Sequence, residues 1–418
     1  MMGRLLVFRC IHALQYILTL VLIISVLLGC NHANKRDGFD PIKAEWAEIE
    51  SKGKGTTVQM TMWQGDPLIN LYMANYVAPE LKKRYDIELK INPGQGNDIV
   101  KWLLADKEAG NSSSPIDMCW INGETFYQLR QINSLYGPFT DKLPNAGWID
   151  FKNPFIKTDF QQPIAGYECP WGNVQFTIIY DSIRTPKPPL TMEGFEAYIR
   201  LHPYRFTIPY EFTGMTLLKS WLIALSGSKD GLNGKFDEVK YKDLSGKLWD
   251  FINRNKAFFW RSGETFPESL ATMHQMFANN ELDFTMSNND GEVDNKILQN
   301  IFPHSAKAYV LSSGTIQNSH YLGIPVGAPN KAGAMTVINF LVSPEAQFRK
   351  FNPSVWGDGT VLDIDRLPSE WQKRFSALPE RTHSPKRKEI QNQALQEPAP
   401  EYMIRLTEDF RKYVIEKK

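Results

Sequence analysis

The chain has 418 residues and a nearly balanced charge, with 47 Lys and Arg against 46 Asp and Glu for a formal net charge of +1. Hydrophobic residues make up 42% and charged residues 22%, which is ordinary for a globular protein, and the length favours two lobes over a single core. A surface built to bind nucleic acid would carry a clear basic excess, so the composition argues against a nucleic-acid partner.

The first element is a long apolar run that closes with "SVLLGC". Arg4 and Arg9 precede the run, and no Asp, Glu, Lys or Arg falls within it. This layout is typical of a secretory signal, although the run is long enough to span a membrane. Its end, "LLGC", resembles the lipobox of bacterial lipoproteins, in which a small residue precedes a cysteine that carries a diacylglycerol thioether. We therefore predict a lipoprotein signal peptide over residues 1–29 and lipidation of Cys30, with an uncleaved anchor as the alternative.

Either alternative tethers the bulk of the chain outside the cytoplasm, on a membrane of the cell envelope. Removal of residues 1–29 takes away two arginines and no acid, so the formal charge falls from +1 to −1. The polar residues 30–55 are predicted to be a tether. Cys119 and Cys169 then remain for structure, and since export favours oxidation, they form either a disulfide or two separate buried thiols.

The next part of the chain alternates strands with helices. Three predicted strands, "TTVQMTMW", "IELKINP" and "PIDMCWI", are separated by two helical patterns for which Asp66 and Asn97 are the expected N-caps. A βαβαβ order implies parallel strands whose carboxyl ends share one edge, where ligands bind in open α/β sheets. The loops "WQGDP", "GQGND" and "INGET" therefore meet at that edge, although each alone is an ordinary strand-to-helix turn.

A second group of strands and helices follows the proline cluster "PKPP". The pairs "RFTIPY" with "TGMTLLKSWLIALSG" and "FPESLATMHQMFANN" with "ELDFTM" predict a second α/β lobe. The chain then returns through "AKAYVL" to "HYLGIPVGAPNKAGAMTVINFLVSPEAQ".

This last stretch resembles the C-terminal part of the solute-binding proteins of bacterial ABC importers. The resemblance covers nearly the whole mature chain and points to the type II periplasmic-binding fold, near the thiamine, iron, polyamine and aminoethylphosphonate binders. It implies a two-lobed α/β protein with hinge strands near residues 166–176 and 309–320 and a central ligand cleft. The expected parts are lobe 1 over 56–165 plus 318–345, lobe 2 over 172–312, and a C-terminal helical region over 346–418 that packs on the lobes.

The resemblance implies a lipoprotein that captures a small organic solute and delivers it to an ABC permease and its ATPase. A ligand sensor, or a transferase-type enzyme on the same fold, is the alternative. The sequence lacks the G-x-S-x-G, H-E-x-x-H, phosphate-loop and C-x-x-C patterns. We therefore expect neither catalysis nor a cofactor or metal, and the absence of a Tyr-Tyr pair disfavours iron as the solute.

The loops at the predicted edge suggest what the solute is. "WQGDP", "GQGND", "INGET", "YEFTG" and "SNND" contain acids but no Lys or Arg, which favours a neutral or cationic solute, such as a thiamine-like molecule, over an anion. Trp63, Trp171 and Tyr210 are expected to supply flat surfaces, three asparagines hydrogen bonds, and one acid the partner of a positive group. The candidate residues are Trp63, Asn97, Asn122, Glu124, Trp171, Tyr210, Asn288 and Asp290. Simple packing of the aromatic residues and capping of helices by the acids are the alternatives.

Overall fold

The computed structural model describes residues 39–417, and the elements below belong to the unit that starts at Glu45. The predicted signal peptide and Cys30 lie outside the described residues. Across residues 39–417, no helix is both long enough and apolar enough to cross a membrane.

The first sheet is built around β1, which pairs in parallel with β2 on one side and β3 on the other. Strand β10 is antiparallel to β3, and β6 pairs antiparallel along β10 from Gln317 to Gly323. The three strands predicted in the first part of the chain are therefore confirmed, as is their parallel order. The strands of this sheet are β1 (Thr57–Met62), β2 (Glu88–Pro93), β3 (Met118–Ile121), β6 (Glu168–Gln175), β10 (Thr315–Gly323) and β11 (Ala394–Leu395).

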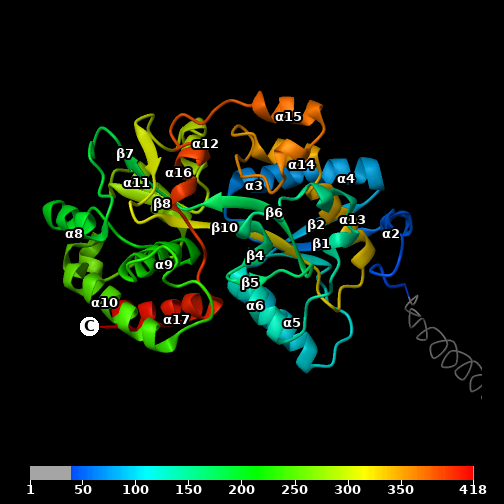
Figure 1. Ribbon diagram of the computed structural model, residues 1–418, viewed down its shortest axis with the longest axis horizontal. Helices are drawn as coiled ribbons and strands as arrows, with labels where there is room; N and C mark the ends of the chain where they lie inside the picture. Colours follow the sequence, from blue (N-terminus) through cyan, green and yellow to red (C-terminus); the bar gives the residue numbers. More distant parts are fainter. Residues whose placement is uncertain (1–38, 418) are drawn as a thin grey trace, which may run out of the picture. The chain divides into compact units, whose positions relative to one another are not determined.

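The second sheet has β7 (Thr177–Asp181) between β8 (Phe284–Ser287) and β9 (Ala306–Tyr309), and both pairings are antiparallel. The chain enters this sheet directly from β6 and returns from β9 into β10, within the two hinge segments expected from the resemblance. In Figure 1, β6 and β10 run between the two sheets. A short hairpin of β4 (Thr158–Asp159) and β5 (Gln162–Pro163) precedes β6. The two-lobed α/β fold is thus confirmed.

Helices surround both sheets. In chain order they are α2 (Trp46–Gly53), α3 (Pro67–Tyr72), α4 (Ala78–Tyr85), α5 (Gly96–Glu108), α6 (Gly123–Gln131), α7 (Pro154–Lys157), α8 (Met192–Leu201), α9 (Phe212–Leu225), α10 (Glu238–Asn255), α11 (Leu270–Ala278), α12 (Glu292–Leu298), α13 (Lys331–Leu341), α14 (Pro344–Phe351), α15 (Ser369–Ser376), α16 (Arg387–Ile390) and α17 (Pro400–Phe410).

Most helix starts follow the local chemistry of the sequence. Asp66 accepts hydrogen bonds from the first amides of α3, and Ser343 does the same for α14. The prediction for α5 is wrong, because its N-cap is Gln95 rather than Asn97. Gln95 and Asp98 form a reciprocal capping box, which satisfies two helix-start amides at once.

The predicted tether, residues 30–55, is too long, because helix α2 lies within it. Ile49 of α2 is fully buried, and Gly53 lies so close to α13 that an added Cβ would come within 3.0 Å of Thr336 Oγ1. Residues 46–53 therefore pack on the folded unit because one face of α2 is apolar.

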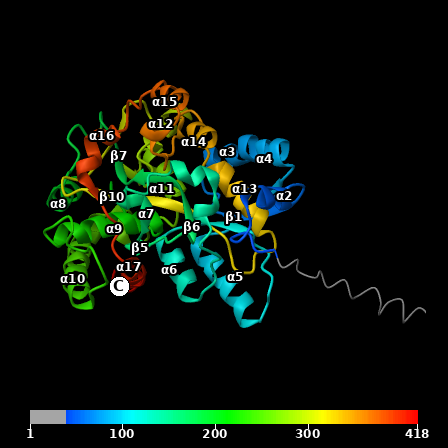
Figure 2. The ribbon, with the colours of Figure 1, turned by 45° about the vertical axis from the view of Figure 1, so that its right-hand side comes forward.

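The C-terminal helix completes the core of the second lobe. Figures 1 and 2 both show α17, in red, beside α9 and α10. Tyr402, Leu406 and Phe410 of α17 are buried in the same apolar cluster as Trp221 of α9 and Phe284 of β8. Removal of the C-terminal segment would expose this cluster to water.

The two cysteines are free and buried, so the disulfide alternative is wrong. Cys119 pairs with Gly323 and Cys169 with Leu322, so β10 lies between them. Strands two apart are separated by about 9.5 Å, whereas bridged Cα atoms lie within about 7 Å.

Thiol labelling tests this arrangement. Burial raises the pKa of both thiols, that of Cys119 to about 12, so neither forms a reactive thiolate at neutral pH. A form that begins at Asn31 should not react with a thiol reagent when folded, and both thiols should react in denaturant without reductant. Failure to label both thiols in denaturant would contradict the assignment.

Candidate functional site

The loops that follow β1 and β3 meet at the carboxyl edge of the first sheet. The ring centroids of Trp63 and Trp120 are 6.4 Å apart at an interplanar angle of 87°. Asn122 accepts a hydrogen bond of 3.1 Å from Trp120 Nε1. Trp63 remains 38% exposed, so its ring is accessible to solvent.

Behind Trp63 lies an aromatic cluster, which we define as Trp63, Trp120, Trp171, His320 and Trp356. Trp120 contacts Trp171 at 5.2 Å and His320 at 4.8 Å between ring centroids. Trp171 comes from β6 and His320 from β10, so the hinge strands supply part of the cluster. Trp171 is fully buried and its Nε1 has no hydrogen-bond partner. It supports the other rings and offers no open face.

Two of the predicted binding residues lie away from this cluster. Tyr210 stacks on Phe410 of α17 at 6.0 Å and packs with the core of the second lobe. Asn97 is exposed in the first turn of α5. Neither residue is brought together with Trp63, so the structure does not support the three-ring clamp that we expected.

Asn288 and Asp290 follow β8 but differ in availability. Asn288 Nδ2 donates to Thr213 Oγ1 at 3.1 Å, and its buried Oδ1 has no donor. Asp290 is fully buried and paired with Arg381 at 2.8 Å and Arg387 at 2.6 Å. Burial alone would raise the pKa of Asp290, but the two arginines hold it at about 2. Asp290 is therefore already neutralised, and its predicted role opposite a positive solute is wrong.

A similar pairing neutralises Asp66. Lys296 of α12 lies 2.8 Å from Asp66 at the start of α3 and 3.0 Å from Glu292. All three side chains are at least largely buried, and the pair joins a helix of the first lobe to one of the second. The predicted loops contain no Lys or Arg. The fold nevertheless places Lys296, Arg381 and Arg387 beside the acids of these loops, from distant positions in the chain.

Two carboxylates with unpaired oxygens belong to an acidic cluster, which we define as Glu124, Asp159 and Glu397 with Lys219. Glu397 Oε2 accepts 2.6 Å from Lys219 Nζ, and its Oε1 accepts 2.9 Å from Asn318. By contrast, Glu124 Oε2 and Asp159 Oδ2 are buried without any donor. Burial raises the pKa of Glu124 to about 7, despite the opposing effect of Lys219. Burial, with Glu124 and Glu397 nearby, also raises the pKa of Asp159 well above its usual value.

The β4–β5 hairpin presses one ring into this cluster. Phe160 and Gln161 at its turn have φ of 46° and 63°, a conformation that bulky residues rarely adopt. The Phe160 ring lies against Gly123, where an added Cβ would come within 1.7 Å of its Cδ2. Lys219 Nζ sits 4.3 Å from the centre of the same ring. Glycine is thus required at the first position of α6.

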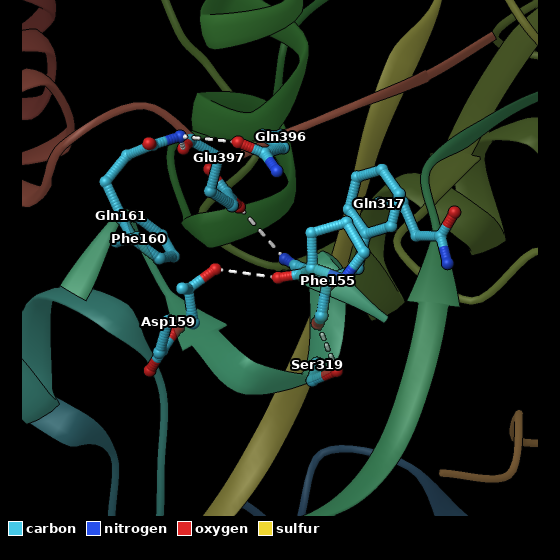
Figure 3. Close-up of a pocket in the computed structure, with 11 residues that line it drawn as sticks. Phe155, Asp159, Phe160, Gln161, Gln317, Ser319, Gln396 and Glu397 are labelled. Carbon is cyan, nitrogen blue, oxygen red and sulfur yellow. Dashed lines mark hydrogen bonds between the residues drawn. The ribbon is translucent and has the colours of Figure 1, made fainter. Parts of the chain in front are cut away.

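A narrow pocket opens beside the acidic cluster. Its lining includes Asp159, Phe160 and Gln161 of the hairpin, together with Asn318, Gln396 and Glu397. Figure 3 shows Gln161 reaching toward Gln396 and Glu397, with Nε2 donating 3.2 Å to Gln396 Oε1 and 2.8 Å to the Glu397 carbonyl.

Sequence reasoning missed Asp159, Lys219 and Glu397. Lys219 lies in the apolar pattern of α9, where a single basic residue that must be buried was the available signal. Asp159 and Glu397 lie outside the strand-end loops and carried no such signal.

The Lys296 pairing predicts a large loss of stability when one partner is removed. In Lys296→Met, Asp66 and Glu292 would remain buried without a base, and the free energy of unfolding should fall by about 3–5 kcal/mol. Lys247→Met is the matched control, because Lys247 forms an exposed pair with Asp243 and should cost less than about 0.5 kcal/mol. Urea unfolding measures both variants, and equal stabilities would contradict the pairing.

Comparison with known proteins agrees with this geometry. The family of bacterial extracellular solute-binding proteins matches residues 76–374. The protein YnjB of Escherichia coli K12 is 34% identical over 329 residues, which cover 78% of this chain and 84% of YnjB.

Solved structures show the same fold at low identity. The Tp0655 (TpPotD) lipoprotein of Treponema pallidum superposes with a TM-score of 0.61 at 13% identity and covers 86% of this chain and 99% of its own. A putative spermidine/putrescine ABC transporter protein of Listeria monocytogenes gives 0.59 at 18% identity, covering 85% and 99%. An extracellular family acts outside the cytoplasm, which is the compartment that the N-terminal sequence predicts. The chain therefore belongs to the bacterial extracellular solute-binding protein family, and its role is to capture a solute.

Proposed function

We propose that the protein captures an organic solute that carries a positive charge and delivers it to an ABC-type importer. Delivery to such an importer is supported by the solved structures of the same fold, several of which are named as ABC transporter proteins. Two of those names refer to spermidine and putrescine or to PotD, and this wording belongs to those proteins.

The observation that carries the proposal is the pair of buried carboxylate oxygens without donors, Glu124 Oε2 and Asp159 Oδ2. An unsatisfied buried polar group costs about 1–3 kcal/mol, and more when it is charged. Lys219 Nζ donates to Glu397 Oε2 and to neither of these two oxygens. A positive group on the solute would supply the missing donors, whereas an anion would add a further negative charge.

The exposed ring of Trp63 supplies the second half of the site. Trp63 is linked through Trp120 and Asn122 to Gly123 and Glu124, so one loop joins the aromatic cluster to the acidic cluster. A cation over an indole face is stabilised by about 0.5–2 kcal/mol. A molecule with both a flat ring and a positive charge, such as a thiamine-like cation, fits this combination. Asn122 and Asn288 are the proposed hydrogen-bonding residues.

The alternatives retained from the sequence are a neutral solute, a ligand sensor and a transferase-type enzyme. A neutral solute could donate hydrogen bonds to these oxygens but would bring no charge to offset ionised carboxylates, so the acidic cluster favours a cation. A sensor would share the binding site and differ only in its protein partner. Mass spectrometry of solute that co-purifies under native conditions separates the solute classes, and turnover of that solute by the purified protein would favour an enzyme.

Calorimetry on two variants tests the charge and the ring. Glu124→Gln removes a charge-assisted interaction, and Trp63→Ala removes the exposed ring. Glu124→Gln should weaken the tightest-binding cation roughly 10- to 100-fold, in line with about 1.5–3 kcal/mol for a hydrogen bond to a charged group. Trp63→Ala should weaken it about 2- to 30-fold, in line with about 0.5–2 kcal/mol for a cation over an indole face.

The test panel contains organic cations, neutral amides and phosphonates. Glu345→Gln is the matched control and should bind like the wild type. Glu345 lies in the first turn of α14, where it pairs with Arg84. Tightest binding of a phosphonate, with no loss in either variant, would refute both the charge and the ring assignments.

We further propose that the mature protein is anchored by lipid at Cys30, as "LLGC" after the apolar run indicates. Two or more acyl chains make a stable anchor, since each buried methylene contributes about 0.8 kcal/mol.

Replacement of Cys30 by serine tests the anchor. Serine cannot form the thioether, so Cys30→Ser should take up no labelled fatty acid and should leave the membrane fraction if the signal is still cleaved. Labelling equal to that of the wild type would exclude lipidation at this residue.

A further inference from the structure

We propose that the positive group of the solute replaces a proton held by Glu124 and Asp159, so that capture of the solute releases a proton to solvent. This inference rests on the proposed function, since it concerns the same site and a cationic solute.

The arrangement of charges around Glu124 explains why a proton is held. The groups that face it come from three separate elements: Lys219 from α9, Asp159 from the β4–β5 hairpin, and Glu397 from the segment before α17. Lys219 is the one basic residue among these groups, and it forms an ion pair with Glu397, with 2.6 Å between Nζ and Oε2. The charge of Asp159 also acts on Glu168, another buried carboxylate with both oxygens unpaired. Arg130 acts on Glu168 from α6.

Ionisation of both Glu124 and Asp159 would therefore leave buried negative charge with no partner. Such charge costs several kcal/mol, and a buried carboxyl group avoids it by keeping its proton. Their raised pKa values agree with this reasoning, and the value of about 7 for Glu124 places the change within the neutral range.

The exchange balances in charge. The free site holds a neutral carboxylic acid; on binding, the O–H bond breaks, the proton leaves to solvent, and the carboxylate accepts hydrogen bonds from the cation. One positive charge enters as one leaves, so closure of the lobes buries no additional net charge. A neutral solute would displace no proton.

The sign of the pH dependence follows from this exchange. The pKa of Glu124 is raised in the free protein and must fall when a cation binds, because the cation favours the ionised form. Affinity is therefore highest above pH 7 and falls as the pH drops below it. For one carboxyl of pKa about 7, the dissociation constant should rise about tenfold between pH 8 and pH 6.

Isothermal titration calorimetry of the full chain in detergent tests the inference. The probes are putrescine, spermidine, choline and thiamine, and the tightest binder is measured at pH 6, 7 and 8 in two buffers that differ in ionisation enthalpy. The difference between the buffers counts released protons, and we expect about one per bound cation at pH 6 and about none at pH 8.

Variants assign the released proton. Glu124→Gln and Asp159→Asn should both bind the cation more weakly. The variant that replaces the proton-carrying residue should also lose the pH dependence of binding, while Glu345→Gln should keep the wild-type pH profile. If both variants fail to bind, the number of protons that the wild-type protein releases per bound cation still tests the inference. Cation binding without proton release, or an unchanged pH profile in both folded variants, overturns the inference and leaves the proposed function standing. Absence of binding for all four cations overturns both.

Discussion

The antiparallel pairing of β6 with β10 is the interaction on which the rest of the structure depends. It runs from Gln317 to Gly323 and joins the two stretches of chain that pass between the sheets. Side chains of these two strands also reach the site: Trp171 and His320 enter the aromatic cluster, and Asn318 binds Glu397. Because the same strands connect the lobes and support the site, rotation of one lobe against the other would move the two clusters relative to each other.

Buried charge is distributed unevenly across this frame. Asp290 pairs with two arginines, and Asp66 shares Lys296 with Glu292. Asp358 pairs with Lys350 and lies 3.0 Å from His320 Nε2. Each of these acids is matched because a lone buried charge is costly. Glu124 and Asp159, like Glu168, differ from these acids, because each keeps at least one buried oxygen without a donor. Under the proposed function, the missing partner of Glu124 and Asp159 would arrive from solution with the solute.

The sequence was informative wherever the determining interaction is local. Parallel β1, β2 and β3 follow from alternating apolar residues, and the caps of Asp66 and Ser343 from short-range hydrogen bonds. It was misleading where the partner is distant: Asp290 meets Arg381 and Arg387 about 90 residues away, as its ion pairs record. The disulfide alternative was wrong for the same reason, because no local pattern shows that β10 lies between the strands of Cys119 and Cys169. Asn97 shows that even a local rule can mislead, since Gln95 with Asp98 makes a better cap.

The inner end of the candidate site is covered in this structure. Asp159 is only 2% exposed and Trp171 is fully buried, so a solute cannot reach the inner end of the site while the present contacts hold. The Asp66–Lys296 pair is one of those contacts, and it links α3 to α12 directly. In the open state water can solvate both charges, which offsets much of the lost Coulomb attraction. The pair would therefore favour closure only modestly, and under the proposed function the interactions of the solute with Glu124, Asp159 and Trp63 would supply the remaining preference for the closed state.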